Sequence, residues 1–288
     1  SMTFTAFQAG AVIGPALTGF VIAYFAQEAV YYFNAISFAA VLFALFMIGD
    51  VPQAIAEKTS GISLNAIKDG VRFILAKPII FSTMMVDFVA TFFASASTLM
   101  PIIAKDVLNV GVVEYGYLSA ASAVGAVAVA LVISQVKEIR KQGMVFVVAV
   151  IIFGIATIIF GITRSFVVAW LAIAITGGAD GVSTIVRNTI RQLQTPDHVR
   201  GRMTSINQIF FMGGPQLGEI EAGTVAQFFG APFAVITGGI GCILGTLLII
   251  WKWPQLKDFN GDEPIEAGGS LPSPSTGASI IANRVRKQ

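Results

Sequence analysis

The sequence predicts an all-α polytopic membrane protein. Apolar residues make up 55% of the chain and charged residues only 12%, whereas soluble domains average about 25% charged residues. A helix needs about 20 apolar residues to cross a hydrocarbon core of ~30 Å, and the chain contains a series of hydrophobic segments of about that length. We expect eight transmembrane helices, at Phe4–Tyr24, Val30–Ile48, Ile79–Met100, Tyr117–Val136, Met144–Ile162, Phe166–Val186, Met203–Phe229 and Ala231–Trp251.

Positive charge gathers on one side of these segments. If the chain crosses the membrane at each of them, every one of the 18 Lys and Arg residues except Lys105 and Arg164 lies on the same side. Such an asymmetry is typical of cytoplasmic loops. We therefore expect a multi-pass protein of the cell (inner) membrane with both termini in the cytoplasm. The basic residues are interpreted as topological anchors and not as a surface for nucleic acid.

Signatures of enzymes and metal sites do not stand out. Cys242 is the only cysteine and lies inside the last apolar segment, which excludes an internal disulfide or a metal site of paired cysteines. His198, the only histidine, falls in an expected cytoplasmic loop. Gly239, Gly241 and Gly245 superficially resemble a nucleotide loop, but an apolar 20-residue segment favours helix packing. The sequence predicts no enzyme, no cofactor and no metal.

Composition divides the chain into four regions. Residues 1–49 hold the first two segments and residues 78–253 hold the other six. Between them, residues 50–77 form a linker with apolar residues at helical spacing, which predicts an amphipathic helix on the cytoplasmic membrane surface; a partner-binding helix is the alternative. These apolar residues are Leu64, Ile67, Val71, Ile74 and Leu75. Residues 254–288 are rich in Gly, Pro and Ser, so we expect a disordered cytoplasmic tail.

One internal repeat bears on the architecture. Gln8, Gly14, Pro15 and Leu17 recur at a constant offset of 200 as Gln208, Gly214, Pro215 and Leu217. The second set lies six helices after the first, and a six-helix unit repeated in parallel is a known transporter architecture. The first helix here then corresponds to the fifth of twelve. We expect four preceding helices as missing partners, and no coupled transport by these 288 residues alone.

Four stretches, in their order along the chain, resemble the major facilitator superfamily. The stretch from Gly10 to Gly19 is similar to the antiporter motif of the fifth helix in exporters of this superfamily, and Asn34–Phe38 is similar to the sixth helix. Pro101–Asp106 and Thr195–Arg202 resemble the loops between helices seven and eight and between helices ten and eleven. The resemblance is to the drug/proton antiporters and transmembrane secretion effectors. It implies that the eight helices here correspond to helices 5–12 of a twelve-helix transporter.

Ionisable residues deep in a membrane are costly and mark candidate functional sites. Asp87 lies eight residues past Ile79, roughly 12 Å into the core, and Asp180 lies about 9 Å from the cytoplasmic edge. Glu219 and Glu221 lie near the middle of their helix and point about 200° apart. The first three are candidates to bind protons or substrate. The alternative is that each carboxylate is neutralised by a neighbouring helix and only fixes packing.

The helical wheel assigns different surroundings to the two glutamates. Glu219 shares a face with Gln208 and Gln216, which suits the wall of a water-filled path. Glu221 shares a face with Gly214 and Gly218, which suits close helix packing. No basic residue lies within the expected span of the Asp87 or Glu219 helix. Asp87→Asn and Glu219→Gln are therefore expected to abolish proton-driven export without unfolding the bundle.

A second group of residues is expected to act in gating or helix packing. The Gly-Pro pairs are expected to bend their helices and to let neighbours approach, while Arg200 and Arg202 are candidates to close a cytoplasmic gate by pairing with acidic groups or helix C-termini. Ordinary topological anchoring is the alternative for the two arginines. The group consists of Gly14, Pro15, Gly214, Pro215, Gly218, Glu221, Arg200 and Arg202.

Together these features predict a secondary active transporter. We expect it to export a small, partly apolar molecule by alternating access, with protons as the driving ion and the lipid bilayer as its surroundings. The second hypothesis is a non-transporting membrane scaffold or assembly subunit, because much of the expected cavity wall would come from the four missing helices. The identity of the substrate does not follow from these residues.

Overall fold

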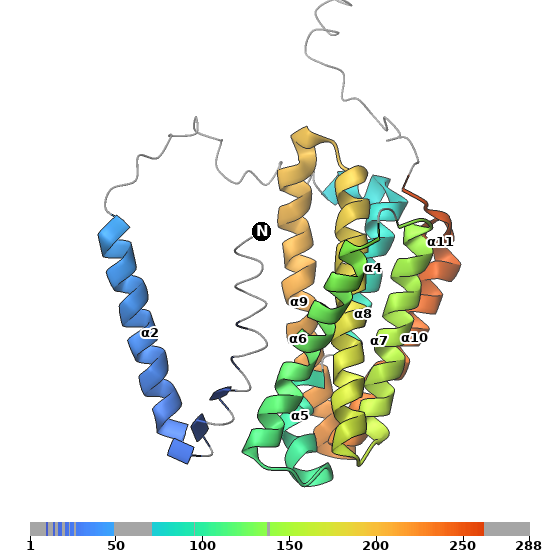
Figure 1. Cartoon of the computed structure of the whole chain (residues 1–288). Helices are drawn as coiled ribbons and strands as arrows, with labels where there is room; N and C mark the ends of the chain where they lie inside the picture. The colour runs from blue at the N-terminus through green and yellow to red at the C-terminus, as the bar shows by residue number, and fades with distance from the viewer. Residues whose placement is uncertain are drawn as a thin grey trace, which may run out of the picture.

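Helices form all the regular secondary structure in the described part of the computed structural model, which covers residues 10, 14, 17–18, 21–22, 24–25, 27–48, 71–94, 96–136 and 139–261 (Figure 1). In chain order they are α2 (Gln27–Ile48), α4 (Pro78–Phe93), the 3-10 turn η1 (Ala96–Leu99), α5 (Met100–Ile102), the π-helical turn η2 (Ile103–Val107), α6 (Val112–Ser134), α7 (Gln142–Ile162), α8 (Phe166–Leu193), α9 (Asp197–Phe229), α10 (Ala231–Lys252) and α11 (Gln255–Asp258). The all-α fold expected from the sequence is confirmed.

Five of these helices are long and apolar enough to cross a membrane. They are α2, α6, α7, α8 and α10, and they support a multi-pass membrane protein. α4 is equally apolar but has only 16 residues, about 24 Å of helix. α9 has 33 residues, including Glu219 and Glu221, and is more polar. Most of the expected span Phe4–Tyr24 lies outside the described residues, so the expected number of eight is not established.

The expected span Ile79–Met100 is not one continuous helix. α4 ends at Phe93, and the chain continues through the short turns η1, α5 and η2. A helix continued through Pro101 would lose an N–H donor and clash with the carbonyl group four residues earlier, at a cost of about 3 kcal/mol. The proline instead lies in the first turn of α5, where its missing N–H costs nothing.

Two other helices extend beyond their expected ends. α8 continues past Val186 to Leu193, and α9 begins at Asp197 and not at Met203. The hydrophobic segments end earlier because the added turns carry Arg187, Arg191, Arg200 and Arg202. Hydropathy therefore marks where each of these helices ceases to be apolar. The helix itself extends further, α8 at its C-terminal end and α9 at its N-terminal end.

Glycines let the helices of the bundle approach closely. A Cβ atom on Gly177 of α8 would collide with the backbone carbonyl of Ser122 in α6, and one on Gly218 of α9 would collide with that of Phe92 in α4. Gly238 of α10 meets the carbonyl of Phe93 in the same way. Without Cβ atoms these helices pack backbone against backbone. α8 thus packs on α6 and α7, while α4 packs on α9 and α10.

α2 and the segment that follows α10 differ in how they pack against this bundle. α2 stands beside it in Figure 1 and is exposed along its length; Phe46, for example, is 88% exposed. After α10 the chain stays packed as far as Gly261, beyond the boundary expected at residue 253, because Leu256 and Phe259 are buried against α7. The backbone N–H of Gly143 donates to the carbonyl of Phe259. Residues 262–288 of the expected tail lie outside the described part.

The expected linker is described only at its C-terminal end. Residues 71–76 are helical, and Ile74 is buried in an apolar cluster with Met84, Met203 and Ile206. Val71 and Leu75 are exposed. The end of the linker is therefore held between α4 and α9, whereas Leu64 and Ile67 lie outside the described residues.

Candidate functional site

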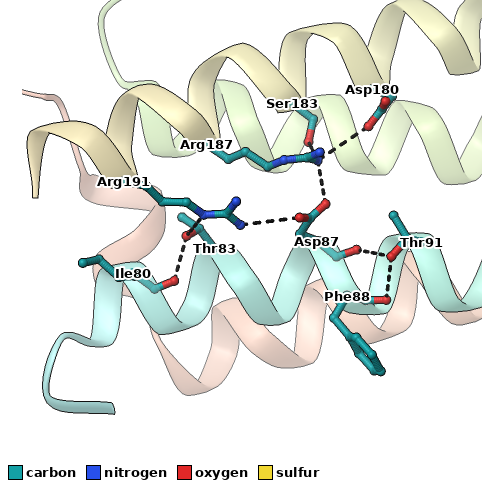
Figure 2. A network of polar contacts seen from close by, with 9 residues as sticks. All are labelled: Ile80, Thr83, Asp87, Phe88, Thr91, Asp180, Ser183, Arg187 and Arg191. Carbon is teal, nitrogen blue, oxygen red and sulfur yellow. Dashed lines mark hydrogen bonds and ion pairs between the residues drawn. The ribbon is translucent and has the colours of Figure 1, made fainter. Parts of the chain in front are cut away.

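Two polar stripes face each other between α4 and α8 (Figure 2). On α8 the polar residues Asp180, Ser183, Arg187 and Arg191 follow one another at spacings of three or four, which places them on one side of a helix. Thr83, Asp87 and Thr91 follow the same spacing on α4. The long arginine side chains connect the stripes of the two helices.

Asp87 lies at the centre of this network. Its side chain is only 4% exposed, and each carboxylate oxygen meets a different arginine: Nη1 of Arg187 lies 2.6 Å from Oδ1, and Nη2 of Arg191 lies 3.5 Å from Oδ2. Both guanidinium groups are as buried as the carboxylate, at 4% and 3% exposed. A buried charge is tolerated when it is paired and hydrogen-bonded, so this carboxylate and these arginines depend on one another.

Hydroxyl groups supplement the ion pairs. Arg191 donates from Nε to Oγ1 of Thr83 at 3.3 Å, and the Thr83 hydroxyl donates to the carbonyl of Ile80. Arg187 donates to Oγ of Ser183 at 3.2 Å. Arg191 is thus held by two residues of α4, whereas Arg187 also has a partner on its own helix.

Asp180 provides a second carboxylate for Arg187. Its Oδ1 lies 3.5 Å from Nη1 of Arg187, the same nitrogen that meets Asp87. The Asp180 side chain is 54% exposed and so lies at the edge of the network, while Asp87 lies in its interior. One guanidinium nitrogen therefore connects an exposed carboxylate with a buried one.

A small cavity opens beside these residues. Its volume is about 10 Å³, which is room for about one water molecule. Polar side chains of α4 and α8 form one wall, and apolar side chains of α4 and α7 form the other. The lining residues are Asp87, Ala90, Thr91, Val150, Phe153, Asp180, Ser183 and Arg187.

This geometry corrects the interpretation of Arg187 and Arg191 as topological anchors. Both arginines are buried and pair with Asp87. The expectation that no basic residue lies within the span of the Asp87 helix is correct for α4, but it left out the partner helix, which was expected to end at Val186. The signal available in the sequence was the spacing from Asp180 through Ser183 and Arg187 to Arg191, which is that of one helix face.

The other candidate carboxylates lie elsewhere. Glu219 is exposed on α9, and so are Gln208 and Gln216. Glu221 is half-buried on the same helix. The ion pairs of the network join Asp87 and Asp180 to Arg187 and Arg191. Among the described residues, the structure thus brings Asp87 and Asp180 together and leaves the two glutamates apart.

The residues expected to serve packing or gating fall into two groups. Gly214 and Gly218 are buried against α4, where a Cβ on Gly214 would meet Thr91 and Phe88; the neighbour of this glycine face is therefore α4. Pro215 lies inside α9 without ending it. A Cβ on Gly14 would meet nothing within 4 Å, and Pro15 lies outside the described residues.

For Arg200 and Arg202, the two arginines expected to close a gate, the structure describes the backbone alone. Arg200 and Arg202 lie in the first two turns of α9, and not in a loop, but their side chains are outside the described part of the structure. Their pairing stays a prediction.

A bundle of apolar helices with buried, paired charges between two of them suits a multi-pass membrane protein. The comparison with protein families agrees: residues 3–270 match the family described as transmembrane secretion effectors, within the major facilitator superfamily, and the chain belongs to this family. The family and the relatives named below are membrane transport proteins and not enzymes.

Individual relatives are exporters. The chain is 22% identical over 198 residues to the enterobactin exporter of Salmonella typhi, covering 69% of this chain and 48% of that protein. It is also 22% identical over 208 residues to the enterobactin exporters of Citrobacter koseri and Escherichia coli O6:K15:H31, covering 72% of this chain and 50% of each relative. The chain thus spans about half the length of the curated relatives it matches.

Proposed function

We propose that this chain belongs to a secondary active transporter that exports a small, partly apolar molecule by alternating access, driven by protons. The family match supports the export of a substrate. The observation that carries proton coupling is the buried Asp87 carboxylate with its exposed neighbour Asp180, because ionisable groups inside a membrane serve proton relays. In this proposal the described helices correspond to helices 6–12 of twelve.

Export is tested with the protein at its full native length in proteoliposomes. We expect an imposed proton gradient to drive accumulation of one member of a panel of siderophores, drugs and lysolipids, and an ionophore that dissipates the gradient to abolish it. Siderophores are included because the named relatives export enterobactin. The absence of gradient-driven flux for every member of the panel, in protein that is folded and inserted, would favour the alternative of a non-transporting scaffold.

Orientation in the membrane is tested by single-cysteine labelling. The positive-charge asymmetry predicts that Lys141 faces the cytoplasm and that Asn109 lies outside, and both are exposed positions. In a Cys242→Ser background, we expect a membrane-impermeant maleimide to label Asn109→Cys in intact cells and Lys141→Cys only after the cells are opened. Labelling of Lys141→Cys in intact cells would contradict the predicted orientation.

A further inference from the structure

Basic side chains gather at one end of the neighbouring helices α7 and α10. Arg140 and Lys141 precede α7, Lys252 ends α10 and Lys257 lies in α11, and all four are exposed. The loops at the opposite ends of α7 and α10 carry a single charged residue, Arg164. The four basic residues at the first end are called the basic edge.

The chain after α10 folds back and holds these cations on one surface. Leu256 and Phe259 are buried against α7, and the N–H of Gly143 donates to the carbonyl of Phe259 at 3.0 Å. A Cβ atom on Gly143 would collide with the carbonyl of Leu256, so the two backbones are in direct contact. Lys257 follows Leu256 directly, and Lys141 lies two residues before Gly143. The contact therefore places a cation of α11 beside the start of α7 (Figure 1).

Tryptophan residues at this end suit the surface of a membrane. Trp251 is 84% exposed, and Nζ of Lys252 lies 4.8 Å from the ring centre of Trp253. The Trp253 ring in turn packs edge-on against Phe81 of α4, with 5.4 Å between the ring centres. Tryptophan is enriched where membrane proteins meet the lipid headgroups. The Trp253 ring, held by α4, therefore orients Lys252 at the level of the headgroups.

An apolar surface continues from the basic edge toward the middle of the membrane. On α7, Met144, Val148 and Ile152 are exposed at intervals of four residues, and Leu244 and Leu248 are exposed on α10. The two helices pack on each other, and α7 contains no charged residue. A molecule bound at this end thus meets cations at one end and apolar side chains along its length.

The charge of this end selects an anionic occupant. Asp258 is the only acidic residue among the described residues 139–144 and 251–261, so the basic edge leaves a net charge of +3 there. Basic clusters beside membrane helices attract anionic lipid headgroups, and each Lys or Arg near the surface raises the affinity about fivefold. A headgroup with two phosphates balances more of this charge than a headgroup with one.

We propose that the basic edge binds an anionic phospholipid, with its phosphate between Lys141, Lys252 and Lys257 and its acyl chains along α7 and α10. A lipid with two phosphates is the preferred ligand. The inference goes beyond the proposed export and does not depend on it. In the proposed orientation, the lipid belongs to the cytoplasmic leaflet. A lipid fits better than a soluble anion because the exposed Trp251 and the apolar surface lie beside the cations.

Lipid binding is measured by native mass spectrometry of the full-length protein in detergent, with cardiolipin, phosphatidylglycerol and phosphatidylcholine as the probes. For the first lipid bound, we expect cardiolipin to bind most tightly and phosphatidylcholine most weakly. Lys252→Gln and Lys257→Gln should each weaken cardiolipin binding about fivefold, and the double variant about 25-fold. Lys257→Arg keeps the charge and should bind cardiolipin as the wild-type protein does.

Arg164→Gln is the matched control, because it removes one positive charge at the opposite end of α7. The 21 residues of α7 span about 30 Å, which is several times the Debye length of about 8–10 Å, so the affinity for cardiolipin should change less than about twofold. An equal loss in Arg164→Gln and Lys257→Gln would show attraction by net charge alone and overturn the proposal. Wild-type affinity in the double variant, or equal binding of all three lipids, would also overturn it.

Gly143→Ala tests the geometry of the site without removing a charge. The added Cβ would collide with the carbonyl of Leu256 and displace α11 together with Lys257. Cardiolipin should then bind about fivefold more weakly, as if the charge of Lys257 were lost, and Lys257→Gln should add little in this background. Unchanged affinity in folded Gly143→Ala, or displacement of cardiolipin from the wild-type protein by millimolar inorganic phosphate, would overturn the inference. The lysine variants, at exposed positions, decide the question if Gly143→Ala folds poorly.

Discussion

Asp87→Asn is expected to lower the free energy of unfolding by about 3–5 kcal/mol, the cost of breaking a buried ion pair from one side. The substitution leaves the guanidinium groups of Arg187 and Arg191 buried without a carboxylate. This differs from the expectation based on sequence alone, in which the variant loses coupling and keeps its stability. Denaturant unfolding in detergent micelles, followed by tryptophan fluorescence, measures the effect.

Asp180→Asn is the matched control for Asp87→Asn. The Asp180 side chain lies at the edge of the network and its ion pair with Arg187 is longer, at 3.5 Å, so its loss is expected to cost less stability than the loss of Asp87. Equal stability of Asp87→Asn and the wild-type protein would contradict the buried network.

A triple variant separates stability from function. Replacing all three buried partners together, as Asp87→Leu, Arg187→Met and Arg191→Met, is expected to restore stability to within about 1 kcal/mol of wild type, because apolar residues of similar volume often replace buried ion pairs without loss. Gradient-driven export should stay abolished in this variant. Recovery of export would show that Asp87 serves packing alone.

Gly218→Ala is expected to destabilise the bundle by about 1–3 kcal/mol, as overpacking does in other cores. The added Cβ would collide with the backbone carbonyl of Phe92, and a helix backbone cannot turn aside as a flexible side chain can. α4 and α9 must then separate, and α4 carries Asp87. Thermal unfolding in detergent measures the loss.

Gly223→Ala lies on the same helix and provides the control. A Cβ there would meet no heavy atom within 4 Å, and alanine is favoured over glycine inside a helix by about 0.5–1 kcal/mol. We therefore expect opposite signs for the two substitutions. A similar loss for both would indicate that glycine acts through helix flexibility and not through the contact with Phe92.

Asp87 shows how far the candidate site could be predicted. Its position inside an apolar helix identified it as a candidate, since a carboxylate there is costly without a role. Its partners were missed because Arg187 and Arg191 follow the last apolar residue of their helix, where basic residues are usually topological anchors. The ion pair joins positions 104 residues apart in the case of Arg191, and no local pattern encodes such a separation.

Glu219 and the glycines of α9 also show which part of the site could be predicted from the sequence and which part could not. The helical wheel separated Glu219 from Gly214 and Gly218 because directions around one helix follow from its 3.6-residue period. It could not decide which neighbour the glycine face meets, and the structure places α4 there.

The sequence by itself determined the fold class and the family: an all-α, multi-pass membrane protein with the candidate carboxylate Asp87 inside an apolar helix. This was possible because segment length, hydropathy and the spacing of residues on one helix are local properties. Only the tertiary structure decided that Asp87 faces two arginines, that one of them also reaches Asp180, and that α4 packs on α9 through glycine. These features depend on how separate helices rotate and approach, which is fixed by packing across the whole bundle.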